Sequence, residues 1–131
     1  MGDIPHGWAC AELMLLVRDI LFFEAAEDTD DPHLWIAPGV MPHWFSTATT
    51  VGVRDAPTIF GGPFGYTLAH DEAARTLELR ILEAPPRAVR YALMCRFGTV
   101  GNALSDAGAV TIDDRTVWFP HGTTRATIRY A

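Results

Sequence analysis

The sequence predicts a mainly β protein, an antiparallel, jelly-roll-like β-sandwich with one N-terminal α-helix. Seven or eight short segments rich in β-branched and aromatic residues follow one another, with turns rich in Gly, Pro and Asp between them. A single long apolar stretch without period-two alternation lies near the N-terminus. The clearest strand alternates three apolar with three polar residues: Leu77, Leu79 and Ile81 against Thr76, Glu78 and Arg80.

The apolar stretch predicts a helix over residues 8–26. Pro5 and Gly7 precede it, and Asp3 or His6 can close its N-terminal end. A helix whose apolar residues cover more than one narrow stripe needs partners over most of its surface, so we expect it to pack against a sheet face or edge. Those apolar residues are Trp8, Leu13, Leu15, Leu16, Val17, Ile20, Leu21, Phe22 and Phe23.

The acidic segment 27–32 ends this helix and is predicted to be a solvated turn. A calcium-binding loop is the alternative, although the alternating oxygen ligands of an EF-hand are absent.

The rest of the chain predicts a β-sandwich over residues 34–131, so that residues 1–131 form a single domain. A short helical turn is expected at 41–45 and a loop at 98–108. Because Trp118 and Phe119 are adjacent in a strand, one of them must face outward. The expected strands are 34–38, 49–54, 64–68, 76–81, 88–97, 110–112, 116–119 and 123–130.

Composition limits the classes of function. The chain has 131 residues, 49% of them hydrophobic, and a formal net charge of −6, which argues against nucleic acid or an anionic membrane as the main partner. All ten basic residues are Arg, which excludes Schiff-base and P-loop lysine chemistry from this chain. Residues 13–23 lack the features of a signal peptide and are too short to span a bilayer. We therefore expect no membrane partner and a cytoplasmic location.

Cysteine and histidine usage predicts no metal site and no cofactor. Cys10 and Cys95 are expected to be buried free thiols, with a disulfide or a reactive thiol as alternatives. Neither Ser46 nor Ser105 lies in a Gly-x-Ser-x-Gly motif. A metal site assembled from separate strands stays open. The histidines are scattered without ligand spacing: His6, His33, His43, His70 and His121.

The candidate catalytic residues are His6 and Glu12. Glycoside hydrolysis needs two carboxylates that flank the substrate, and Glu12 follows His6 and Trp8 closely in sequence. The second acid would be Glu24, Asp55 or Asp71. The alternative is that His6 is a loop residue and Glu12 a solvated residue of the helix.

Aromatic residues are the candidates for substrate binding, because an aromatic ring complements the C–H face of a sugar. We select Trp8, Trp44 and Trp118. Trp35, Tyr66 and Tyr91 belong to the same pool, and the alternative for all of them is a place in the core.

Four stretches together resemble the C-terminal end of large bacterial six-hairpin glycosidase-like proteins. They are His-Gly-Trp-Ala-x-Ala-Glu-Leu-x-Leu-Leu-x-Arg-Asp from residue 6, Leu-Trp-Ile-Ala-Pro-Gly-Val from residue 34, Pro42-x-Trp44, and Val-Arg-Asp-Ala-Pro-Thr-x-Phe-Gly from residue 53. The resemblance implies that the first stretch is the last helix of an (α/α)6 barrel and that the second begins a C-terminal β-sandwich. It covers about the first half of the chain. The rest of the barrel is missing, so the resemblance implies a remnant or fragment that folds alone.

The leading functional hypothesis is therefore a C-terminal β-sandwich module derived from a carbohydrate-active enzyme, with a structural role or weak glycan contact. One alternative is a small hydrolase of glycosidic, ester or lactone bonds with its site at an oligomer interface. Another is an assembly protein that acts through its apolar helix. A helix without its barrel neighbours leaves apolar surface in water, so we expect a homo-oligomer, most simply a dimer. The expected interface residues are Leu13, Leu16, Val17, Ile20 and Phe23.

Overall fold

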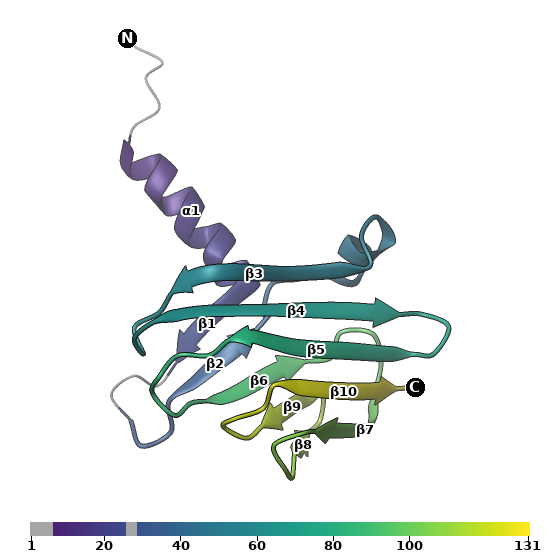
Figure 1. Ribbon diagram of the computed structural model, residues 1–131. Helices are drawn as coiled ribbons and strands as arrows, with labels where there is room; N and C mark the ends of the chain where they lie inside the picture. Colours follow the sequence, from purple (N-terminus) through teal and green to yellow (C-terminus); the bar gives the residue numbers. More distant parts are fainter. Residues whose placement is uncertain (1–6, 26–28) are drawn as a thin grey trace.

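Two five-stranded sheets stack face to face, and one helix projects from an end of the stack (Figure 1). A computed structural model describes residues 7–25 and 29–131. Strands with one apolar face are stable only when that face is covered, and here each sheet covers the other. The predicted mainly β sandwich with one N-terminal helix is confirmed.

The rear sheet in Figure 1 contains the shorter strands, in the order β1-β2-β6-β9-β8. Its pairs are antiparallel except β2 and β6, which run parallel. This pair departs from the fully antiparallel prediction. The strands are β1 (Phe22–Ala25), β2 (His33–Ile36), β6 (Arg90–Met94), β8 (Thr111–Asp113) and β9 (Thr116–Phe119).

The front sheet has the order β3-β4-β5-β10-β7, and all its pairs are antiparallel. The short helix η1 (Pro42–Ser46) precedes it, close to the predicted turn. Its strands are β3 (Thr50–Pro57), β4 (Pro63–Asp71), β5 (Thr76–Glu83), β7 (Val100–Ser105) and β10 (Arg125–Tyr130).

The core lies between the two sheets and follows the pairing register. One row crosses the rear sheet through Phe22, Ile36, Leu93 and Val117, all at most 2% exposed. Within the expected strand 88–97, the alternate residues Val89, Tyr91, Leu93 and Cys95 are all buried.

Two strands differ from the prediction. The helix α1 (Gly7–Leu21) ends before residue 26, because Phe22–Ala25 forms β1 and pairs with β2. Cross-strand burial of Phe22 against Ile36 favours the strand there over helix continuation. The segment predicted as loop at 98–108 contains β7, which pairs with β10. The predicted helix end at residue 26 lies outside the described residues.

Candidate functional site

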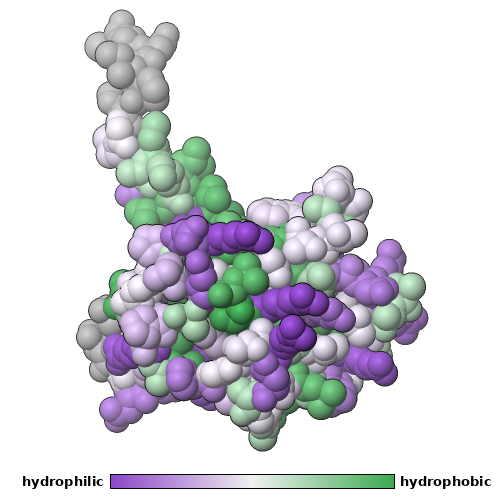
Figure 2. Space-filling view, viewed as in Figure 1, coloured by the Kyte–Doolittle hydropathy of each residue, from purple (hydrophilic) through white to green (hydrophobic). Residues whose placement is uncertain are grey.

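The helix α1 is the most exposed apolar element of the structure. All its residues from 7 to 17 are exposed, and only residues 18–21 are half-buried. Trp8 is 71% exposed and Met14 73%. Figure 2 shows hydrophobic surface, in green, along the helix where it stands clear of the sandwich. The expectation that α1 packs on a sheet face or edge is therefore wrong for residues 7–17, and only the last turn packs on the sandwich, through Ile20 and Leu21.

The sandwich explains this position. Each sheet already covers the inner face of the other, so no inner face is left for a helix. Cys10, expected to be buried, is exposed for the same reason, whereas Cys95 is buried as predicted, and both thiols are free.

The C-terminal end of α1 is fixed firmly to the sandwich by its last carbonyls. The Leu21 carbonyl accepts a hydrogen bond from the Ala37 amide at 2.8 Å and another from the buried Tyr66 hydroxyl. The Ile20 carbonyl accepts one from the Gly39 amide at 3.0 Å. A side chain on Gly39 would begin 3.0 Å from the Ile20 Cα, so the close approach favours glycine. These bonds supply partners that a helix end lacks.

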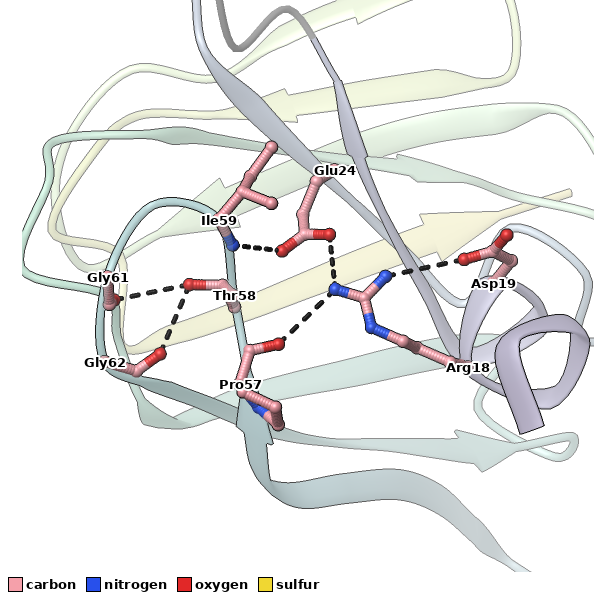
Figure 3. Close-up of polar contacts among 8 residues, drawn as sticks. All are labelled: Arg18, Asp19, Glu24, Pro57, Thr58, Ile59, Gly61 and Gly62. Carbon is pink, nitrogen blue, oxygen red and sulfur yellow. Dashed lines mark hydrogen bonds and ion pairs between the residues drawn. The ribbon is translucent and has the colours of Figure 1, made fainter. Parts of the chain in front are cut away.

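An ion pair adds to these hydrogen bonds (Figure 3). We call the contacts of Arg18, Ile20, Leu21 and Glu24 with the sandwich the joint. The Arg18 guanidinium binds the Glu24 carboxylate, lies 4.4 Å above the Phe22 ring and reaches the Pro57 carbonyl at 3.4 Å. The other Glu24 oxygen accepts a hydrogen bond from the Ile59 amide at 2.7 Å. The side chain of Glu24 is only 7% exposed. The joint therefore links α1, β1 and the loop after β3, and it fixes the direction in which α1 projects.

Two apolar hollows flank α1 on different sides. The rear hollow, of about 420 Å³, lies between α1 and the outer face of the rear sheet. The front hollow, of about 770 Å³, lies between α1 and β3. The rear hollow is lined by Leu16, Asp19, Ile20, Phe23, Trp35, Pro38 and Gly39. The front hollow is lined by Ala11, Leu13, Met14, Leu15, Val17, Arg18, Leu21, Phe22, Val53, Ala56 and Pro57.

The catalytic pair of His6 and Glu12 stays a prediction. His6 lies outside the described residues, and Glu12 is exposed on α1. Two of the acids considered as its partner have other contacts: Glu24 belongs to the joint, and Asp71 accepts a hydrogen bond from the Ala74 amide at 2.9 Å.

The three tryptophans chosen for substrate binding lie on separate elements. Trp8 is on α1, Trp44 on η1 and Trp118 on β9. Phe119 is buried and Trp118 points outward, so the expectation for this adjacent pair is confirmed. Tyr66 and Tyr91 belong to the core, where burial raises both pKa values, that of Tyr91 to about 12.

An outward cluster on the rear sheet surrounds Trp118. Trp35 and Trp118 face each other across Ala92, with ring centroids 5.6 Å apart and planes inclined by 62°. His33 meets Trp118 at 5.1 Å, and the Arg90 guanidinium lies 4.5 Å above the Trp118 ring. The sequence offered no signal for this cluster, because it depends on the register of three strands.

Asp31 fixes the cation of this cluster. Its carboxylate accepts two hydrogen bonds from Arg90, at 2.7 and 2.5 Å. The hydrogen bonding of Arg90 holds the pKa of Asp31 below its ordinary value. His33 Nδ1 lies 2.9 Å from the Asp31 carbonyl oxygen, which can only accept, so this nitrogen is the donor.

A third hollow, of about 310 Å³, gathers polar groups beside η1: His43, Ser46, His70 and Glu72. The Ser46 hydroxyl donates to the His43 carbonyl at 2.6 Å, and His70 Nε2 lies 2.5 Å from the Tyr130 hydroxyl. Burial is the main cause of the raised pKa of Tyr130, and the tautomer of His70 decides which of the two groups donates. These bonds occupy Ser46 and His70 with partners other than each other.

The described residues offer neither a metal site nor a membrane-spanning helix. Within residues 7–25 and 29–131, no group of three or more His, Cys, Asp or Glu could hold a metal ion. No helix in the same part of the chain is long and apolar enough to cross a membrane. No family model, curated protein or solved structure matches the chain.

Proposed function

We propose that this chain is a structural β-sandwich module that presents α1 for burial against an apolar helical surface. One observation carries the proposal: the last turn of α1 is fixed by the joint, while residues 7–17 are exposed and largely apolar. A joint that sets the direction of a helix is useful when that direction must match a partner.

Energetics support burial of α1 in an assembled state. A 15-residue helix without tertiary packing is at the margin of stability in water. Burial of one large apolar side chain contributes about 1.5–3 kcal/mol. A helix that is apolar on several sides is typical of one surrounded by neighbours.

The resemblance to six-hairpin glycosidase-like proteins favours a class of parent protein for this module. An apolar helix followed by a β-sandwich is the order implied for the end of a six-hairpin glycosidase-like protein. We therefore propose a carbohydrate-active enzyme as the source of the module, with support of a helical domain as its role.

A complementation experiment tests this role. The chain is titrated into a purified (α/α)6 glycosidase domain from which the last helix has been deleted, and binding is followed by calorimetry. We expect binding by the wild type and its loss in a Leu13→Glu, Leu16→Glu double variant. A matched surface variant on the opposite end of the molecule, Leu104→Glu, should bind as the wild type does, because Leu104 is 65% exposed on β7. No binding by the wild type would overturn the helical-domain role.

Weak glycan contact is a second candidate, favoured by the outward cluster around Trp118. Its rings adjoin a cation and a carboxylate whose charges cancel, which suits an uncharged ligand rich in hydroxyl groups. Titration with neutral oligosaccharides should quench tryptophan fluorescence in the wild type and not in Trp118→Ala. Equal quenching in both proteins would contradict this site.

A further inference from the structure

We propose that the partner of α1 in solution is a second copy of this chain, with the α1 helix of each copy in the front hollow of the other. The inference rests on the proposed function, because it names an occupant for the same exposed helix. It assigns the contact to one side of α1 and leaves the rear hollow outside the interface.

The two hollows use different sides of the helix. Leu16, Ile20 and Phe23 line the rear hollow at spacings of four and three residues, and Met14, Val17 and Leu21 line the front hollow at spacings of three and four. At 100° per residue, Leu16 and Ile20 are centred roughly 115° from the stripe of Met14, Val17 and Leu21. The five interface residues expected from the sequence are therefore divided: Leu13 and Val17 line the front hollow, and Leu16, Ile20 and Phe23 the rear one.

Charge favours the front hollow. Its one charged lining residue, Arg18, is already paired with Glu24. The rear hollow includes Asp19, whose side chain is 45% exposed and lies 3.5 Å from Arg18, so that one guanidinium is shared by two carboxylates. A rear contact would therefore bury one surplus negative charge from each copy, and each copy already carries a formal charge of −6.

Shape favours the same side. Each chain supplies both a projecting helix and a hollow, which is the self-complementarity that a two-fold interface requires. By the dimensions of an α-helix, half the surface of α1 is about 350 Å². Two such halves give roughly 700 Å², less than the ~1,000 Å² expected of a biological interface. Contact with the hollow wall at Val53, Ala56 and Pro57 on both copies supplies further area.

Sedimentation equilibrium of three proteins tests the proposal: wild type, Val17→Glu and Leu16→Glu. The two variants place the same charge on adjacent exposed residues of α1, one lining each hollow. We expect a wild-type dimer over the micromolar range. Val17→Glu should raise its dissociation constant at least ~30-fold, and Leu16→Glu should change it less than about threefold. Equal thermal unfolding temperatures would show that both variants keep the sandwich.

Each other outcome overturns a specific statement. A monomeric wild type, or a dimer that Leu16→Glu also disrupts, overturns the front-hollow dimer. If that wild type still binds the truncated helical domain, the proposed docking role survives without the dimer. A dimer that neither variant affects, in a chain that does not bind the helical domain, overturns both, because association would then not involve α1.

Discussion

The helix and the sandwich differ in where their apolar side chains lie. Leu34, Phe64 and Phe119 of the sandwich are 0% exposed, whereas Leu13, Met14 and Leu16 of α1 are more than half exposed. Both regions are rich in the same residue types, so composition does not separate them. The difference is that the two sheets cover each other, while residues 7–17 of α1 are left uncovered by the described residues.

The joint is the boundary between these regions. Upstream of Arg18 the helix has no half-buried residue, and from Arg18 onward every residue to Phe22 is at least half-buried. Substitutions before Arg18 should therefore affect the free energy of unfolding much less than substitutions after it. The following predictions test that difference.

A Leu→Ala substitution should change the free energy of unfolding far more in the sandwich than in α1. Leu34→Ala removes a fully buried side chain from β2 and should lower the free energy of unfolding by about 2–5 kcal/mol. Leu13→Ala removes a side chain that is 61% exposed and should change it by less than about 0.5 kcal/mol in the monomer. Urea unfolding followed by tryptophan fluorescence measures both. Comparable losses would show that α1 belongs to the folded core.

Of two substitutions that break ion pairs, Glu24→Gln in the joint should lower the free energy of unfolding more than Asp31→Asn, which lies outside it. It removes a charged acceptor whose side chain is 7% exposed and leaves Arg18 half-buried, which should cost about 1–3 kcal/mol of unfolding free energy. Asp31→Asn breaks a pair with Arg90 in which the two side chains are 51% and 43% exposed, and it should leave the urea midpoint nearly unchanged. The reverse order would contradict the structural importance of the joint.

Acid should weaken the sandwich through Asp106. Hydrogen bonds from the Thr124 hydroxyl and from the amides of Arg125 and Thr124 lower its pKa to about 2 from an ordinary 3.8. A lowered pKa in the folded state means that the carboxylate stabilises the fold above about pH 4 and ceases to do so as the pH falls through 2. The stability difference between wild type and Asp106→Asn should shrink over that interval. A constant difference would show that Asp106 is not the group responsible.

The thiols give the mildest test of the comparison. Cys10 on α1 is exposed and Cys95 in the sandwich is buried, so a thiol reagent should modify one cysteine in the native protein and two in denaturant. Protection of Cys10 that disappears on dilution would locate it near an α1 interface. Rapid reaction of Cys95 in the native state would contradict the closed core.

The sequence predicts the elements whose pattern is local. Alternation identifies β5 through Leu77 and Leu79, and the Asp113-Asp114 pair indicates the β8–β9 hairpin, whose turn lies at Asp114 and Arg115. The strand β1 was hidden because Ile20, Leu21, Phe22 and Phe23 form an apolar run without a period. Its state is decided by pairing with β2.

The remaining differences depend on contacts between distant segments. Gly101 and Asn102 give β7 a weak strand signal, and its pairing with β10 decides the outcome. The Trp35–Trp118 contact requires the register of β2, β6 and β9. An apolar helix predicts a contact surface, and the nearest candidate in this sequence is the sheet. Only the structure shows that each sheet already covers the inner face of the other, so that this surface is not open to α1.

Hydrogen exchange measured by mass spectrometry tests the central claim most directly, because it reports on both regions in one experiment. At concentrations where the chain is monomeric, we expect the amides of residues 8–17 to exchange at nearly unprotected rates, and those of β2, β5 and β6 to stay protected. Association should protect residues 8–17 and leave β2, β5 and β6 unchanged. Equal protection of α1 and the sandwich in the monomer would contradict the claim that α1 depends on a partner.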